Sequence, residues 1–156
     1  MSISIRPMSL EDYDEVLALW QAAEGVGLNE ADERGPIAAY LRRNAGLSLV
    51  ACNDRQIVGA VLCGHDGRRG YLHHLAIAPA FRRRGIGRKL VEQCLAGLGS
   101  QGILRCHIFL YVDNHGGSGF WRTLGWIERT ELKILTKGIG ETSLVPAICS
   151  DVAHRT

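Results

Sequence analysis

Residues 75–90 read LAIAPAFRRRGIGRKL, and this stretch carries the strongest structural signal in the chain. The apolar run 71–77 predicts a buried strand, which Pro79 ends. Apolar residues then recur at helical spacing, which predicts an amphipathic helix; they are Ile86, Leu90, Cys94, Leu95 and Leu98. The connecting loop contains Gly85 and Gly87. The stretch therefore predicts a strand, a glycine-bearing loop and a helix in direct succession.

The start of this helix has the properties of an anion site. A helix start leaves backbone N–H groups without intrahelical partners and carries partial positive charge. Glycines without side chains let a phosphate approach the main chain. Five basic residues fall within eight positions: Arg82, Arg83, Arg84, Arg88 and Lys89. A charged helix start without a ligand is the alternative, but the helix start, the two glycines and the five basic residues together favour binding of a pyrophosphate. A Rossmann loop would need glycine at Leu90, and a Walker loop would need Gly-Lys-Ser/Thr.

The composition is that of a single globular domain. The chain has 156 residues, of which 46% are hydrophobic and 22% charged, and its net charge of +2 is too small for general nucleic-acid attraction. No apolar run approaches the roughly 18 residues of a membrane span. Residues 1–7 lack the pattern of a signal peptide, and the five cysteines form no C-x-x-C pair. We therefore expect reduced thiols, a cytoplasmic location, and neither nucleic-acid nor membrane partners.

The remaining segments alternate between strands and helices. The predicted order is β-α-α-β-β-β-α-β-α-β, which implies a mixed sheet with helices on both faces. Strands are expected at 3–5, 47–52, 57–63, 71–77 and 103–112, and one or two more at 126–135. Residues 138–156 show little periodicity, so we expect a tail or an additional edge element there.

Two motifs in this order resemble a known family. The pattern Arg82-x-x-Gly85-x-Gly87, preceded by Leu75-Ala76-Ile77-x-Pro79, is similar to the acyl-CoA-binding signature of the GCN5-related N-acetyltransferase (GNAT) superfamily. Asn114, Phe120-Trp121 and Leu124-Gly125-Trp126 look like its second motif. The resemblance covers about residues 3–137. It implies one acetyltransferase domain over 1–156, with 138–156 as a C-terminal extension. The implied fold is a mixed, mostly antiparallel α/β sheet of about six to seven strands, in which 71–77 and 103–112 splay apart.

The resemblance also implies how acetyl-CoA would bind as co-substrate. Pantetheine would pair with the backbone of Leu75, Ala76 and Ile77, and a main-chain N–H near Leu75 would polarise the thioester carbonyl. Asn114 would fix the second motif beside the pantetheine arm, and Trp121 would pack against it. The pyrophosphate would contact the loop and first turn of the helix, namely Arg82, Arg83, Arg84, Gly85, Ile86, Gly87 and Arg88. No residues show metal-ligand spacing, so no metal is expected.

Acetyl transfer to an amine requires a proton acceptor, because a free alkylamine has a pKa near about 10. His73 and His74 both lie on the strand beside the expected thioester. Neighbouring strand residues face opposite ways, so we expect at most one of them to face the cleft. The resemblance favours His73, since a family member uses a histidine at the matching position in proton removal. A histidine bonded to a carbonyl in a structural role is the alternative.

The general acid is harder to assign. Family members usually carry a tyrosine seven residues after the asparagine, and Trp121 stands there, whose indole N–H is too weak an acid. Tyr71 and Tyr111 are the nearest substitutes; otherwise coenzyme A leaves as a thiolate or takes a proton from water. Cys106 and His107 are expected on opposite strand faces, which argues against a covalent thiol intermediate.

These observations predict direct acetyl transfer in a ternary complex to a primary amine of a small molecule or protein. Acids in the loop between the first two helices would suit a cationic amine, although a solvated acidic loop explains them equally well; they are Glu24, Glu30, Asp32 and Glu33. A non-catalytic acyl-CoA sensor is the main alternative, and nucleic-acid binding by the arginines a weaker one. A homodimer using the tail from Gly138 is compatible with the sequence.

Overall fold

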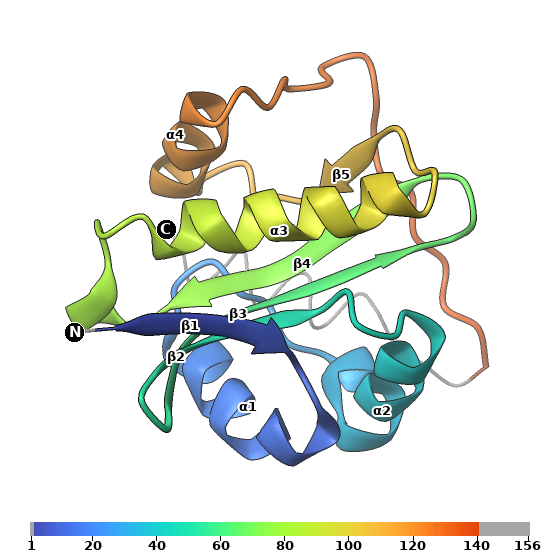
Figure 1. The fold of residues 1–156 in the computed structure, drawn as a ribbon. Coiled ribbons are helices and arrows are strands. Elements are labelled where there is room, and N and C mark those ends of the chain that lie inside the picture. Colours follow the sequence, from blue (N-terminus) through green and yellow to red (C-terminus); the bar gives the residue numbers. More distant parts are fainter. Residues whose placement is uncertain (1, 141–156) are drawn as a thin grey trace. The chain divides into compact units, whose positions relative to one another are not determined.

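The computed structural model describes residues 2–140 and contains a five-stranded sheet in the order β1-β2-β3-β4-β5 (Figure 1). The strands are β1 (Ile3–Pro7), β2 (Leu49–Asn53), β3 (Gln56–His65), β4 (Gly70–Ile77) and β5 (Cys106–Ile108). The first four strands pair antiparallel, and β5 pairs parallel to β4. The chain divides into two compact units, Met1–Leu124 and Gly125–Thr156, and the first contains every strand and helix of the described residues.

Helices cover both faces of the sheet. The α-helices are α1 (Tyr13–Ala22), α2 (Arg34–Arg43), α3 (Ile86–Ser100) and α4 (His115–Thr123). Short 3-10 turns precede α1, α2 and α3, and they are η1 (Leu10–Asp12), η2 (Glu30–Asp32) and η3 (Pro79–Phe81). Figure 1 shows α1 and α2 on one side of the sheet and α3 on the other. This mixed α/β arrangement confirms the predicted fold class.

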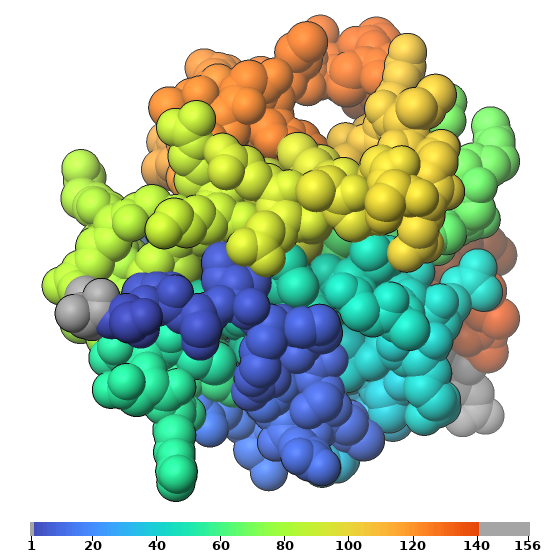
Figure 2. Space-filling view, viewed as in Figure 1, coloured from blue at the N-terminus to red at the C-terminus, as the bar shows by residue number. Residues whose placement is uncertain are grey.

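Each face of the sheet has its own apolar contacts. On the α1 side, Val16 and Trp20 are fully buried in a cluster that includes Leu62 and Ala76. On the other side, α3 buries most of the stripe that its spacing predicted, but Leu95 is 38% exposed. In Figure 2 the residues of α3, yellow-green to yellow, form part of the surface. The residues that α3 buries include Leu90, Val91, Cys94 and Leu98. Burial of these two faces fixes β3 and β4 in the middle of the domain.

The strands after α3 differ from the sequence prediction. The run 103–112 forms a ladder only at Cys106–Ile108, and Phe109 and Val112 are exposed. Residues 126–135 form no strand, so the part of the chain that the structure describes has five strands rather than six or seven. Apolar alternation indicates a strand, but a ladder also needs a neighbour to take its hydrogen bonds. Residues 138–140 are irregular, and the rest of the expected extension, 141–156, lies outside the described residues.

Among residues 2–140, no helix has the length and apolar character that a membrane crossing requires. Cys52, Cys63 and Cys94 are buried free thiols, and Cys106 is partly buried.

Candidate active site

The loop between β4 and α3 has a left-handed backbone at its first glycine. Gly85 is the N-cap of α3, with φ +78°, and Arg83 also has a positive φ of +60°. The N–H of Lys89 donates to the Gly85 carbonyl at 3.1 Å and closes the first turn. The amides of Ile86, Gly87 and Arg88 precede that bond and are the donors that a helix start offers to an anion.

The basic side chains around this helix start have different surroundings. The Arg82 Nε donates to the Ile77 carbonyl at 3.1 Å and ties the loop to the end of β4. The Arg84 guanidinium lies 5.3 Å from the centre of the Phe81 ring, and Arg88 pairs with Glu92 one turn along α3. Arg83, Arg84, Arg88 and Lys89 are all exposed. The loop therefore presents four cations beside the helix amides, while Arg82 also holds its shape.

Gly87 has a packing role that the sequence did not indicate. It is buried, and a Cβ added there would lie 3.3 Å from Cζ of Phe120. Its missing side chain therefore lets α4 pack closely on the first turn of α3. Gly85, by contrast, is exposed with open space around it, so its left-handed backbone is the reason for glycine.

The parallel pair β4–β5 is joined over three residues only. Gly70, Tyr71 and Leu72 pair with Cys106, His107 and Ile108. Beyond Leu72 the described residues of β4 have no ladder partner on the β5 side, and residues 109–112 leave the sheet. The predicted splay is therefore present, and the free edge of β4 at Leu75, Ala76 and Ile77 leads directly to η3 and the start of α3.

The second motif caps α4 and contacts the loop after α1. The Asn114 Oδ1 accepts the Gly117 N–H at 2.9 Å, which makes Asn114 the N-cap of α4. The Asn114 Nδ2 lies so near Gly25 that a Cβ there would be 2.6 Å away. Trp121 is 7% exposed and meets Phe120 edge to face at 5.1 Å. The Asn114 side chain thus joins α4 to the α1–η2 loop, and Trp121 has the packed environment expected of it.

A bulge in β4 overturns the expectation that only one histidine faces the cleft. Ala76 pairs with Ala60 and His73 pairs with Leu62, so three steps along β4 match two along β3. The extra residue lies at His74, whose φ is +55°. Strict alternation fails across a bulge. Both His73 and His74 consequently line the same cavity of about 450 Å³ between β4 and α2.

His74 is held by a buried carboxylate. Its Nε2 lies 2.8 Å from Oδ1 of Asp32, whose side chain is 8% exposed. The Asp32 Oδ2 accepts the Asn29 N–H at 3.1 Å, and the ring of His74 meets Trp20 edge on at 5.0 Å. Asp32, taken from sequence as one of several loop acids, is therefore a fixed partner of a cavity-lining imidazole.

His73 has a more apolar setting. Its ring stacks on Tyr71 at 6.2 Å with an interplanar angle of 7°, and Phe109 lies 6.0 Å away. Burial lowers the pKa of His73 and the neighbouring His74 lowers it further, whereas Asp32 acts in the opposite direction. His73 is therefore neutral at pH 7 and able to accept a proton.

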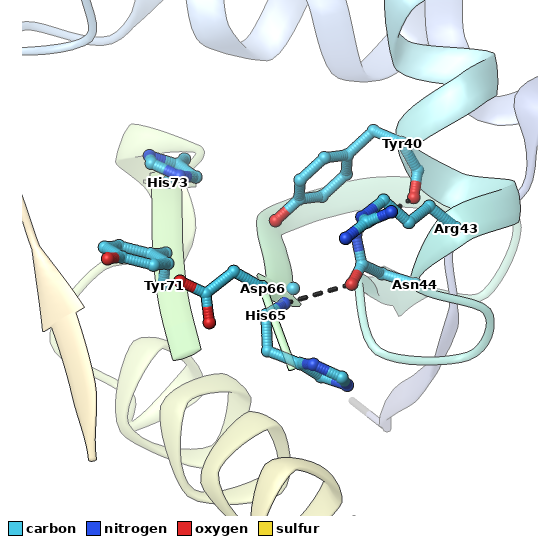
Figure 3. A pocket seen from close by; sticks show the side chains of 8 residues that line it. Tyr40, Arg43, Asn44, His65, Asp66, Tyr71 and His73 are labelled. Atoms are coloured by element: carbon cyan, nitrogen blue, oxygen red, sulfur yellow. Dashed lines mark hydrogen bonds between the residues drawn. The ribbon is translucent and has the colours of Figure 1, made fainter. Parts of the chain in front are cut away.

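A second, smaller cavity of about 200 Å³ adjoins the first, with Tyr40 and His73 lining both (Figure 3). Tyr71 also lines it, and Arg43 and Asp66 contribute opposite charges. The Tyr40 hydroxyl is buried with no hydrogen-bond partner among the described residues, and burial raises its pKa, so it remains protonated. The two cavities therefore meet at His73 and Tyr40.

The predicted site residues thus fall into two groups. Tyr71 and His73 line a cavity, and the residues expected to bind acetyl-CoA lie along β4, the following loop and α3, with Asn114 and Trp121 at α4. Tyr111 lines neither cavity and lies instead against Gly27. Tyr40 was not among the expected site residues, His74 was considered but not preferred as the base, and Asp32 was only one of several loop acids. The available signals were the Asn29-x-x-Asp32 capping pattern and the adjacent histidines, but the bulge was not visible in the sequence.

The structure also bears on alternative chemistry. Burial raises the pKa of the Cys106 thiol to about 12, and its sulfur contacts the His107 carbonyl oxygen at 3.9 Å. The thiol is therefore protonated and is a poor nucleophile. Among residues 2–140, no group of three acidic, histidine or cysteine side chains could hold a metal ion.

Comparison with known proteins identifies the class that this fold and site define. The model of the acetyltransferase (GNAT) family matches residues 13–126, and the chain belongs to this family. Its fold is similar to that of Ard1 from Thermoplasma volcanium, with a TM-score of 0.71 and 21% identity over 81% of this chain and 84% of that one. It also resembles the PaiA N-acetyltransferase from Thermoplasma acidophilum, solved with coenzyme A (TM-score 0.67, 21% identity, covering 80% and 89%). The ribosomal-protein-S18-alanine N-acetyltransferase from Escherichia coli gives a TM-score of 0.69 at 18% identity, covering 83% and 80%.

Proposed function

We propose that the protein is an acetyl-CoA-dependent N-acetyltransferase that moves the acetyl group to a primary amine of a small molecule or protein. The observation that carries this proposal is the free edge of β4, which runs from the histidine-lined cavity to the amides at the start of α3. A ligand with a thioester at one end and a diphosphate at the other matches that succession of features. Family membership supports the same chemistry.

On the acetyl-CoA side, backbone groups carry most of the recognition. The main chain of Leu75, Ala76 and Ile77 pairs with pantetheine, and the N–H near Leu75 stabilises the oxyanion of the tetrahedral intermediate. The amides from Arg83 to Arg88 and the exposed cations beside them hold the pyrophosphate. Asn114 and Trp121 border the pantetheine arm.

On the acceptor side, His73 takes a proton from the amine nitrogen. It lines both cavities, is neutral at pH 7, and is held in place by its stack on Tyr71. The general acid for the departing sulfur is Tyr111 or Tyr71, or water if coenzyme A leaves as a thiolate; a thiol pKa near about 8.5 makes the last route feasible.

The transfer is direct. A covalent acetyl-enzyme would need an ionised nucleophile, and the Cys106 thiol is protonated, as its raised pKa requires. Acetyl-CoA and the amine therefore bind together before reaction. Initial rates measured against both substrates should give intersecting double-reciprocal lines, whereas parallel lines would contradict the ternary complex.

The test has two stages. Calorimetry with coenzyme A should show binding, and Arg88→Gln together with Lys89→Gln should weaken it. Acetyl-CoA is then offered with glycinamide, ethanolamine, putrescine and an alanine-terminated tetrapeptide, and release of the free thiol is followed. Absence of coenzyme A binding would overturn the proposal.

A non-catalytic acyl-CoA sensor is the second candidate, and the observation that favours it is Trp121 at the position of the family's usual tyrosine. A sensor would bind acetyl-CoA and release no thiol with any amine. His73→Ala would leave its ligand response unchanged, whereas the same change in an acetyltransferase reduces turnover.

A further inference from the structure

Conversion of an ammonium ion to an amide removes two protons from one nitrogen. The first must leave before the nitrogen has a lone pair to attack with, and the second leaves once the C–N bond has formed. His73 can accept only one proton at a time. The bulge in β4 places a second imidazole, His74, on the same cavity, with the two ring centres 6.3 Å apart.

We propose, on the basis of the function proposed above, that His74 is a second proton acceptor for the amine and that Asp32 is its positioning residue. The Asp32 carboxylate only accepts hydrogen bonds, so the contact at 2.8 Å requires a hydrogen on Nε2 of His74. Nδ1 of the neutral ring then carries the lone pair. The side chain of His74 is 18% exposed, so the ring remains accessible from the cavity.

Asp32 is fixed so that it cannot turn away. One carboxylate oxygen binds His74 and the other accepts the Asn29 N–H, while the backbone carbonyl of Asp32 accepts the Tyr13 hydroxyl at 2.6 Å. The backbone of His74 adopts a left-handed conformation that non-glycine residues rarely take. Such a conformation is maintained where the surrounding structure requires it, and here it aims the ring at the cavity.

The same capping arrangement occurs elsewhere in the chain with a different partner. Asp12 caps η1 as Asp32 caps η2, and it accepts the Ser9 N–H at 2.9 Å. Its partner is Arg6, whose Nη1 lies 2.8 Å away and which is always protonated. Asp12 lines neither cavity. The pair Asp12–Arg6 is therefore a structural counterpart with which the pair Asp32–His74 can be compared.

The reaction balances with no further reagent. One ammonium proton passes to Nδ1 of His74, and the imidazolium so formed stays bonded to Asp32 until the proton is lost to water. The neutral amine attacks the thioester carbon, the C–N bond forms and the C–S bond breaks. The nitrogen gives its second proton to His73, and the coenzyme A sulfur receives a proton from there or from water.

The deciding variant is His74→Gln. The glutamine amide nitrogen can take the position of Nε2 and still donate to Asp32, but glutamine has no basic nitrogen. With the best amine of the panel, kcat should fall by about 10²–10⁴-fold, as for loss of a general base. The KM for acetyl-CoA and the unfolding midpoint should change little. A His74→Gln variant within threefold of wild-type kcat would overturn the inference while leaving acetyl transfer established.

Asp32→Asn and Asp12→Asn form the matched pair that tests positioning. Asp32→Asn allows the other tautomer and should lower kcat by at least about tenfold. Asp12→Asn should lower stability and leave kcat unchanged. Nitrogen NMR of the wild type should show the Nε2–H tautomer at His74, and the Nδ1–H tautomer would overturn the inference whatever the kinetics. Failure of the proposed function itself would appear differently, as wild-type protein that releases no thiol with any amine.

Discussion

Gly27 lies directly against the hydroxyl of Tyr111, so closely that a Cβ at residue 27 would overlap the oxygen. The contact joins the loop after α1 to the segment that leaves the sheet after β5. Tyr111, a candidate acid, thus depends on a residue more than eighty positions away for its position.

Gly27→Ala should therefore displace Tyr111. We expect the free energy of unfolding to fall by about 1 kcal/mol. This is the low end for overpacking, because the Tyr111 ring is partly exposed. Gly119→Ala is the control, since Gly119 lies inside α4 with open space around it; its free energy of unfolding should rise by roughly 0.5 kcal/mol from helix propensity. Urea unfolding of both variants measures the difference, and equal stabilities would contradict the tight contact.

Two glycines at opposite ends of α3 allow a test of the left-handed cap. Gly85→Ala keeps open space but forces a side chain into φ +78°, at a cost of about 1 kcal/mol. Gly99→Ala adds the same atom near the other end of the helix, where no steric contact opposes it, and should be neutral or stabilising. Calorimetric titration with coenzyme A should show weaker binding only for Gly85→Ala. If Gly85→Ala bound coenzyme A with unchanged affinity, the left-handed cap would not be needed for ligand binding.

The Asp12–Arg6 pair should make stability pH-dependent. The hydrogen bond from Arg6 holds the pKa of Asp12 below its ordinary value, so the carboxylate contributes stability above the unfolded pKa of about 3.9. That contribution disappears as the pH falls through the folded pKa. Asp12→Asn should be less stable than wild type by about 1–2 kcal/mol at pH 7, discounted because Arg6 is half exposed. The two proteins should converge once the pH has fallen below the folded pKa of Asp12. Thermal unfolding across the acid range measures this, and a constant difference would contradict it.

His73 should contribute a pH dependence in the next window. Because the pKa of His73 is lower in the folded protein, the unfolded chain binds a proton at this residue more readily than the folded chain does. The stabilising contribution of neutral His73 is therefore present above about pH 6.5 and is lost as the pH falls. His73→Gln should flatten the stability profile below pH 6.5. In the wild type, the acid limb of kcat/KM should lie below the ordinary histidine value. A limb at or above that value would argue against His73 as the base.

The sequence predicted the fold class well because its signals are local. The loop 82–87 and the apolar stripe of α3 each depend on neighbouring residues. Features that depend on residues distant in the sequence, such as the pairing of a strand with its neighbour, could not be predicted in this way. Residues 103–112 and 126–135 have apolar patterns, yet a ladder depends on what lies beside it.

The site was predicted in part for the same reason. His73 was favoured by the family resemblance, Tyr71 was named as a nearby substitute acid, and the expected pyrophosphate loop was identified from its glycines and basic residues. The packing role of Gly87 was not predicted, because its contact, Phe120, lies on another helix. His74 and Asp32 are 42 residues apart, and only the folded chain brings them together.

The additional residue in β4 exchanges the sheet faces on which odd-numbered and even-numbered side chains lie. Before it, odd-numbered residues such as Tyr71 and His73 face the cavity. After it, Ala76 joins the core beneath α1, and Ile77 points toward Leu90 of α3. One inserted position thus allows a single strand to supply two adjacent imidazoles to one chamber and still anchor the opposite layer. Deleting one residue between 73 and 76 should exchange those two assignments together.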